Sequence, residues 1–202
     1  MTDDADDLDL KTQLHDYLRR GREALLWKLE GLSEHDLRRP LTPTGTNLLG
    51  LVKHLAGIEL DYFGEVFDRP HEIALPWNDH GEANADMWAT PEESSEAIIG
   101  LYHQATAHAD KTIAELPLDG EGYVAWWSHG TDGRWVTLGW ILTHVATETH
   151  RHAGHADILR ELIDGEAGLR PGLLNLPPMR DEDWWADYRA RVQAAADTFL
   201  ES

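Results

Sequence analysis

Residues 138–164 form one helix-forming segment, and its ionisable side chains restrict what the chain can fold into. The segment carries His144, Glu148, His150, His152 and His155. At about 100° per residue, His144, Glu148 and His152 stand one turn apart on the same face. His155 lies about 20° from His144 on that face, whereas His150 points elsewhere and is expected to be solvated. Imidazoles and a carboxylate on one stripe of a helix make half of a metal site, so this face needs a partner helix.

Apolar residues recur at helical spacing in three segments that precede this helix. The predicted helices cover residues 8–32, about 47–67 and about 90–116. Thr46 or Asn47 caps the second helix. Thr90 caps the third, and Pro91 is its first helical residue. His54 lies at the border of the apolar stripe of the second helix, so we expect its side chain to look partly into the protein interior.

The segments between the helices differ in character. Residues 33–46 are expected to form a loop, and residues 69–90 a long connection with little periodicity. Residues 120–137 resemble two short extended runs around a Gly-Thr-Asp-Gly turn, which predicts a hairpin or an irregular loop. Beyond a Pro- and Gly-rich stretch, residues 181–199 are expected to form an acidic, Trp-bearing helix that packs on the outside.

These elements predict an all-α fold, a four-helix bundle with a long crossover connection and an additional C-terminal helix. A chain of 202 residues suits one hydrophobic core. We therefore expect a single helical domain over residues 1–202, with the bundle at about 8–165 and a C-terminal extension at 166–202. Bundles of this kind place metal ions between facing helices.

The net charge is −20, from 37 acidic and 17 basic residues. A nucleic-acid-binding face needs a basic stripe, so no nucleic-acid partner is expected. The acidic N-terminus does not resemble a signal peptide, and no run approaches the roughly 18 apolar residues that span a membrane. These features predict a cytoplasmic protein without a membrane partner.

The chain contains no cysteine. Disulfides, cysteine-based metal sites and a protein thiol nucleophile are therefore excluded. A bound metal must be held by His, Asp or Glu. Any thiol chemistry must use a thiol that a small molecule brings in.

Two motifs resemble those of the DinB-like metal-dependent four-helix proteins. They are LLGLVKHLAGIELDYF at residues 48–63 and HVATETHRHAGHADILRELIDG at residues 144–165. The resemblance covers roughly residues 8–165. Glu148 stands where many family members have His, which places the chain near the thiol-dependent branch. That branch includes mycothiol-dependent maleylpyruvate isomerase and the mycothiol S-transferases, and the end of the second motif looks most like the S-transferases.

The resemblance implies that His54, Glu148 and His152 are the metal ligands. A His₂Glu set leaves coordination positions open, as catalytic zinc sites do. Zn²⁺ is the ion that it suits best, and Ni²⁺, Mn²⁺ and Fe²⁺ are the alternatives. His144 is expected beside the site without contacting the metal. His155 is expected to be catalytic, as a substrate-facing base, or to be an outer partner of a ligand; a surface pairing with Asp157 or Glu161 is the alternative.

The implied function is a metal-dependent thiol S-transferase in detoxification, with mycothiol as co-substrate and an electrophilic small molecule as acceptor. An open metal position can turn a bound thiol into a thiolate near neutral pH. Expulsion of the thiol afterwards would make the enzyme an isomerase. A metal-dependent hydrolase that uses metal-bound water and a non-catalytic metal- or small-molecule-binding bundle are the alternatives, and a homodimer is left open.

Four tryptophans lie just ahead of the histidine-bearing helix. They are Trp126, Trp127, Trp135 and Trp140. They could line the mouth of an apolar pocket for the electrophile. The alternative is that they pack the core and the connections.

Overall fold

The computed structural model describes residues 9–75, 77, 82–127, 133–170, 173–177 and 181–200. Its elements are α1 (Leu10–Trp27), α2 (Glu34–Arg38), α3 (Leu48–Phe63), η2 (Glu65–Phe67), η4 (Ala85–Met87), α4 (Ser95–Glu115), β1 (Glu121–Val124), β2 (Arg134–Thr137), α5 (Leu138–Asp164) and α6 (Glu182–Asp197). The described part of the chain is mostly helical, as predicted, with one small two-stranded sheet.

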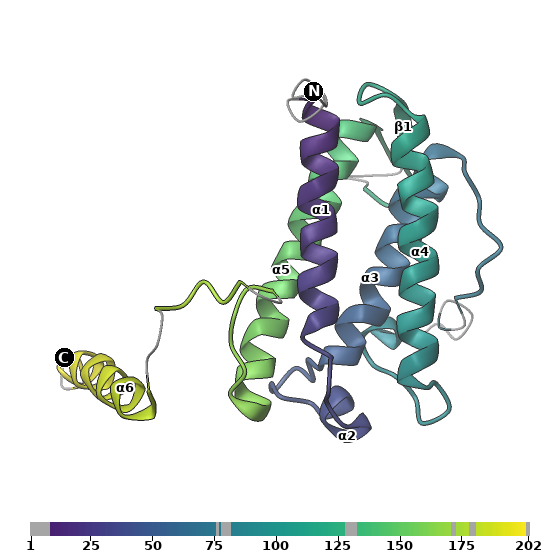
Figure 1. Ribbon diagram of the computed structural model, residues 1–202. Coiled ribbons are helices and arrows are strands. Elements are labelled where there is room, and N and C mark those ends of the chain that lie inside the picture. Colours follow the sequence, from purple (N-terminus) through teal and green to yellow (C-terminus); the bar gives the residue numbers. More distant parts are fainter. Residues whose placement is uncertain are drawn as a thin grey trace, which may run out of the picture.

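α3 is the helix that holds the long helices together. It packs against α4 and α5, while α1 packs against α5 (Figure 1). Its buried residues point in every direction around the helix axis, from Leu48 to Phe63. A helix that is apolar on nearly its whole circumference must be covered on all sides. This explains why α3 is central and why a polar residue such as His54 on it lies between helices.

Two apolar clusters form the core, and a polar layer lies between them along the helices. On α5, residues up to Ala146 belong to one cluster and residues from Ala153 onward to the other. On α1 the same division falls between Leu18 and Ala24. Arg22 lies in this gap and forms a bidentate ion pair with Glu59 of α3, at 2.7 Å for both bonds. The interior therefore contains a polar layer between the two apolar clusters. Glu148 and His152 lie in this layer on α5.

The boundaries of α5 agree with the prediction. The Oγ1 of Thr137 accepts a hydrogen bond from the Trp140 backbone N–H, and Gly165 ends the helix with a φ of 79°. A threonine N-cap and a left-handed glycine after the last turn are local signals that need no tertiary contact. Asn47 likewise caps α3, by accepting from the N–H of Gly50 at 2.8 Å.

Several predicted boundaries were wrong. The second helix ends at Phe63 rather than at about residue 67, and Glu65–Phe67 form the separate 3-10 helix η2. The first helix ends at Trp27 rather than at residue 32, and the predicted loop at 33–46 contains the short helix α2, which Ser33 caps. The third long helix begins at Ser95, not at Thr90. Thr90 donates its N–H to the Glu93 carboxylate in a turn, and Ser94 is the residue whose Oγ caps the helix.

The predicted hairpin is present. β1 and β2 pair antiparallel, with Gly122 opposite Val136. Most of its predicted turn, residues 130–132, lies outside the described residues. Among the described helices, none is long and apolar enough to cross a membrane.

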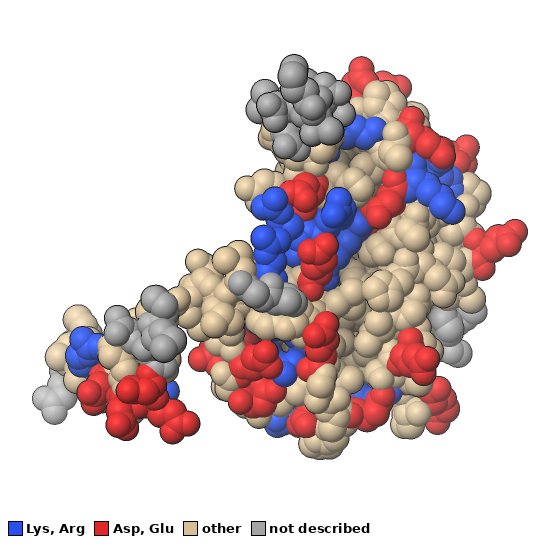
Figure 2. Space-filling view, in the orientation of Figure 1, with Lys and Arg blue, Asp and Glu red and all other residues tan. Residues whose placement is uncertain are grey.

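The C-terminal helix does not pack as predicted. α6 has no buried residue. Figure 1 shows it standing away from the other helices. Figure 2 shows acidic side chains on α6 and scattered over the visible face, with Lys and Arg gathered over α1 and in a smaller group toward the upper right.

Candidate metal centre

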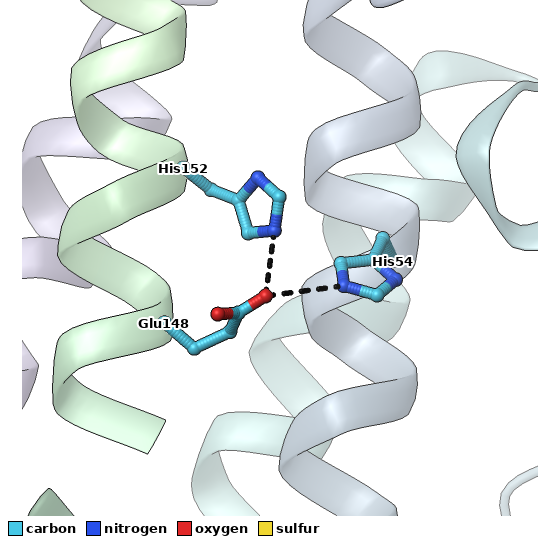
Figure 3. A group of neighbouring side chains, drawn as sticks. All are labelled: His54, Glu148 and His152. Atoms are coloured by element: carbon cyan, nitrogen blue, oxygen red, sulfur yellow. Dashed lines mark hydrogen bonds and ion pairs between the residues drawn. The ribbon is translucent and has the colours of Figure 1, made fainter. Parts of the chain in front are cut away.

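Three side chains from two facing helices meet in the interior. α3 supplies His54, and α5 supplies Glu148 and His152, which are four residues apart and therefore on one face. One ligand atom from each residue lies within 4.8 Å of the others. Figure 3 shows the two imidazoles pointing at the carboxylate between them. The structure thus brings together the three residues predicted as ligands.

The spacing of these atoms suits a small divalent ion. Oε1 of Glu148 lies 3.0 Å from Nε2 of His152 and 3.9 Å from Nε2 of His54. Two ligands of a tetrahedral Zn²⁺ ion, each about 2.0–2.2 Å from the metal, are about 3.3–3.5 Å apart. The two observed separations bracket that value, and all three ligand atoms lie within 4.8 Å of one another, so the residues present could hold the metal that the resemblance implies.

The remaining ring nitrogens of both histidines face away from the cluster. Nδ1 of His54 donates to Oδ2 of Asp86 at 2.6 Å, because an ionised carboxylate can only accept. Nδ1 of His152 lies 3.3 Å from Nδ1 of His155. Each Nε2 is therefore the nitrogen presented to the centre. Sequence reasoning missed Asp86, which lies on η4 in an aperiodic connection that gives no local signal.

The surroundings favour a neutral His152 and an ionised Asp86. Burial lowers the pKa of His152, and the neighbouring His54 lowers it further. The hydrogen bond from His54 holds the pKa of Asp86 below its usual range. Neutral imidazole is the form of histidine that binds a metal.

The other predicted residues lie around the cluster. The ring of His144 packs against Tyr62 and Trp127, with centroids 4.9 and 4.7 Å away, and burial lowers its pKa. His155 is exposed and touches His152. His150, predicted to be solvated, is exposed, but its Nε2 also lies 2.9 Å from the carbonyl oxygen of Tyr17 on α1.

The tryptophans divide into two pairs. The indole N–H groups of Trp126 and Trp127 both donate to the hydroxyl of Tyr62, at 3.3 and 2.8 Å. Trp135 and Trp140 are 70% and 40% exposed. Trp127 is therefore fixed against His144, one helical turn from Glu148. Trp126 is itself 45% exposed, and Trp140 contacts Trp127 with ring centroids 5.8 Å apart, so of these four described side chains only Trp127 lies directly against His144.

A cavity of about 350 Å³ adjoins the cluster on the side of α3 and the connection. His54, Asp61 and Asp86 are among the residues that line it, together with the buried Trp77. Burial raises the pKa of Asp61 to about 6, and the negative charges of Glu65 and Asp86 act in the same direction. A small molecule that enters this cavity would reach the edge of the His54 ring.

This arrangement defines a class: mostly helical proteins with a His₂Glu cluster between facing helices that could hold a metal. The comparison with protein families is more specific. The model of the mycothiol-S-transferase family matches residues 13–165. The chain belongs to this DinB-like family, and its membership indicates an enzyme of the transferase type with a small-molecule thiol as substrate. None of the curated proteins matches the chain.

Proposed function

We propose that the chain is a metal-dependent thiol S-transferase that conjugates mycothiol to an electrophilic small molecule in detoxification. We also propose that α1, α3, α4 and α5 form the four-helix bundle of the DinB-like family. The observation that carries the proposal is the convergence of His54, Glu148 and His152 in a chain of the mycothiol-S-transferase family. The absence of cysteine supports it, because the nucleophilic sulfur must then come from a small molecule.

The proposed metal ligands are His54, Glu148 and His152, and Zn²⁺ is the proposed ion. When bound, a divalent ion with an open coordination position lowers the pKa of a thiol so that it is a thiolate near neutral pH. The three side chains are 27% exposed or less, so a metal ion held by them would lie in a site largely shielded from water. The sulfur forms a bond to an electrophilic carbon, and the leaving group departs with its electron pair.

For His155 we propose one of two roles at this site, a substrate-facing base or a hydrogen-bond partner that orients His152. The contact of its Nδ1 with Nδ1 of His152 supports the role of a partner that orients His152. When Nε2 of His152 binds a metal, its proton must reside on Nδ1, where His155 can accept it. If His155 acts as a base, it must use Nε2, because its Nδ1 is then occupied by His152.

Turnover of a chlorinated arene by the Zn²⁺-loaded protein, with and without mycothiol, tests the proposed function. We expect chloride release that requires both the metal and the thiol and is lost in Glu148→Ala. Equal rates with and without thiol would favour metal-dependent hydrolysis by water. Bound metal without turnover of a panel of electrophiles would favour a non-catalytic binding protein.

A further inference from the structure

The connection between α3 and α4 supplies a residue to the candidate metal centre. We infer that Asp86 is a positioning residue, which fixes the ring orientation and the tautomer of His54 so that Nε2 is presented to Glu148 and His152. The inference rests on the proposed function only in assuming that a metal binds at these three residues.

The hydrogen bond to Asp86 selects one tautomer of His54. Because the carboxylate of Asp86 can only accept, the proton of a neutral His54 ring resides on Nδ1, 2.6 Å away. The lone pair is then on Nε2, which faces Oε1 of Glu148. A carboxylate behind a metal-binding histidine also makes the ring a stronger ligand.

The backbone around Asp86 is fastened to the first turns of α3. The side-chain amide of Asn47 donates to the carbonyl oxygen of Met87 at 3.1 Å. The buried ammonium of Lys53 donates to the carbonyl oxygen of Trp88 at 2.9 Å. Both bonds act within two residues of Asp86, so its carboxylate is held in place rather than reaching His54 from a free loop.

The close approach of the connection to α3 also explains why residue 50 is a glycine. A Cβ atom on Gly50 would lie 1.8 Å from the carbonyl oxygen of Met87, so only glycine permits this approach of the connection. Gly50 is one helical turn before His54, which places Asp86 beside the imidazole. The connection that carries Asp86 therefore packs directly against the face of α3 that carries His54.

A competing explanation is that Asp86 only adds negative charge near a cation. Asp61 provides the matched comparison, because its carboxylate lines the same cavity but makes no hydrogen bond to His54, Glu148 or His152. Loss of the Asp61 charge should weaken metal binding slightly. Loss of the Asp86 carboxylate should weaken it far more, because the orientation of His54 is lost as well.

The test is Zn²⁺ affinity, measured by competition with a chelating dye on the full chain, for wild type, Asp86→Asn, Asp86→Ala and Asp61→Asn. We expect both Asp86 variants to bind Zn²⁺ about 10–100-fold more weakly, and Asp61→Asn within about threefold of wild type. The metal-free Asp86 variants should keep a single cooperative urea transition, which shows that they fold. The Co²⁺ absorption spectrum should change in Asp86→Asn and not in Asp61→Asn.

Two results would overturn the inference. One is an affinity of the Asp86 variants within threefold of wild type, and the other is an equal loss in Asp61→Asn. If wild type itself binds no Zn²⁺, the proposed function fails together with the inference. If wild type binds Zn²⁺ and Asp86→Asn binds it equally well, only the inference fails.

Discussion

Nε2 of His54 lies 3.9 Å from Oε1 of Glu148, although the two residues belong to different helices that the chain connects through the whole of α4 and the hairpin. The packing of α3 against α5 produces this proximity. Stability of the fold and occupancy of the site should therefore be linked, because a metal bound here joins two helices.

The first prediction concerns this linkage. At a free Zn²⁺ concentration 100-fold above its Kd, the free energy of unfolding of wild type should rise by about 2.7 kcal/mol. Glu148→Ala should remove most of this gain, because it deletes the carboxylate that both imidazoles face. Urea unfolding with and without Zn²⁺ measures the effect. Glu161→Ala, an exposed glutamate on the same helix, is the control and should keep the full gain; an undiminished gain in Glu148→Ala would refute the linkage.

His155→Ala distinguishes the two roles considered for that residue. If His155 orients His152, the variant should bind Zn²⁺ about tenfold more weakly or worse. If it is a base, Zn²⁺ affinity should stay unchanged, while thiol-dependent turnover should fall by about 10²–10⁴-fold. The contact between the two Nδ1 atoms leads us to expect weaker binding. If His155→Ala changes neither Zn²⁺ affinity nor turnover, His155 has neither role and is only a surface residue.

The ion pair of Arg22 and Glu59 should be essential to the fold. Arg22→Met leaves the fully buried carboxylate of Glu59 without its partner, which should cost about 3–5 kcal/mol in the free energy of unfolding. The double variant Arg22→Met with Glu59→Met should recover most of this loss, since no unpaired buried charge remains. Urea unfolding of both variants measures the coupling.

A surface ion pair on α1 provides the comparison for the loss in the free energy of unfolding. Arg20 pairs with Asp16, and both side chains are well exposed. Arg20→Met should change the free energy of unfolding by about 0.5 kcal/mol or less. If Arg22→Met costs no more than Arg20→Met, the buried pair does not stabilise the fold as argued.

Much of the helical framework was predictable, because its signals are local. The limits of α5 follow from Thr137 at the start and Gly165 at the end, each acting through its own backbone. His54 could be singled out because it borders the apolar stripe of α3, and the resemblance then paired it with Glu148 and His152. The structure brings these three together.

The missed features depend on contacts between distant segments. Thr90 and Ser94 are both good caps, and the sequence gives no reason to prefer Ser94. Lys53 of α3 binds the carboxylate of Glu93 at 2.9 Å, which holds the Thr90 turn apart from the helix. Asp86 was missed for the same reason, since its place beside His54 depends on how closely the connection approaches α3.

The free energy of unfolding should depend on pH because of Asp61. Its pKa of about 6 in the folded protein exceeds the value of about 3.9 for an unfolded aspartate, so the folded state binds the proton more tightly. The contribution of Asp61 to stability therefore falls as the pH rises from about 4 to about 6 and is constant above. Two pKa units correspond to about 2.7 kcal/mol, which partial exposure reduces to about 1–2 kcal/mol.

Asp61→Asn should consequently stabilise the metal-free protein by about 1–2 kcal/mol at pH 7.5 and by nearly nothing at pH 4. Urea unfolding of both proteins in the presence of a chelator, at several pH values, gives the difference directly. A difference that does not change with pH would show that Asp61 has no raised pKa in the folded state.

The most direct measurement for the central claim is the metal content of the reconstituted protein by elemental analysis. The His₂Glu cluster predicts one Zn²⁺ per chain in wild type and a large loss of metal in each of His54→Ala, Glu148→Ala and His152→Ala. Well under one equivalent in wild type, or one equivalent retained in all three variants, would contradict the claim that these residues form a metal centre.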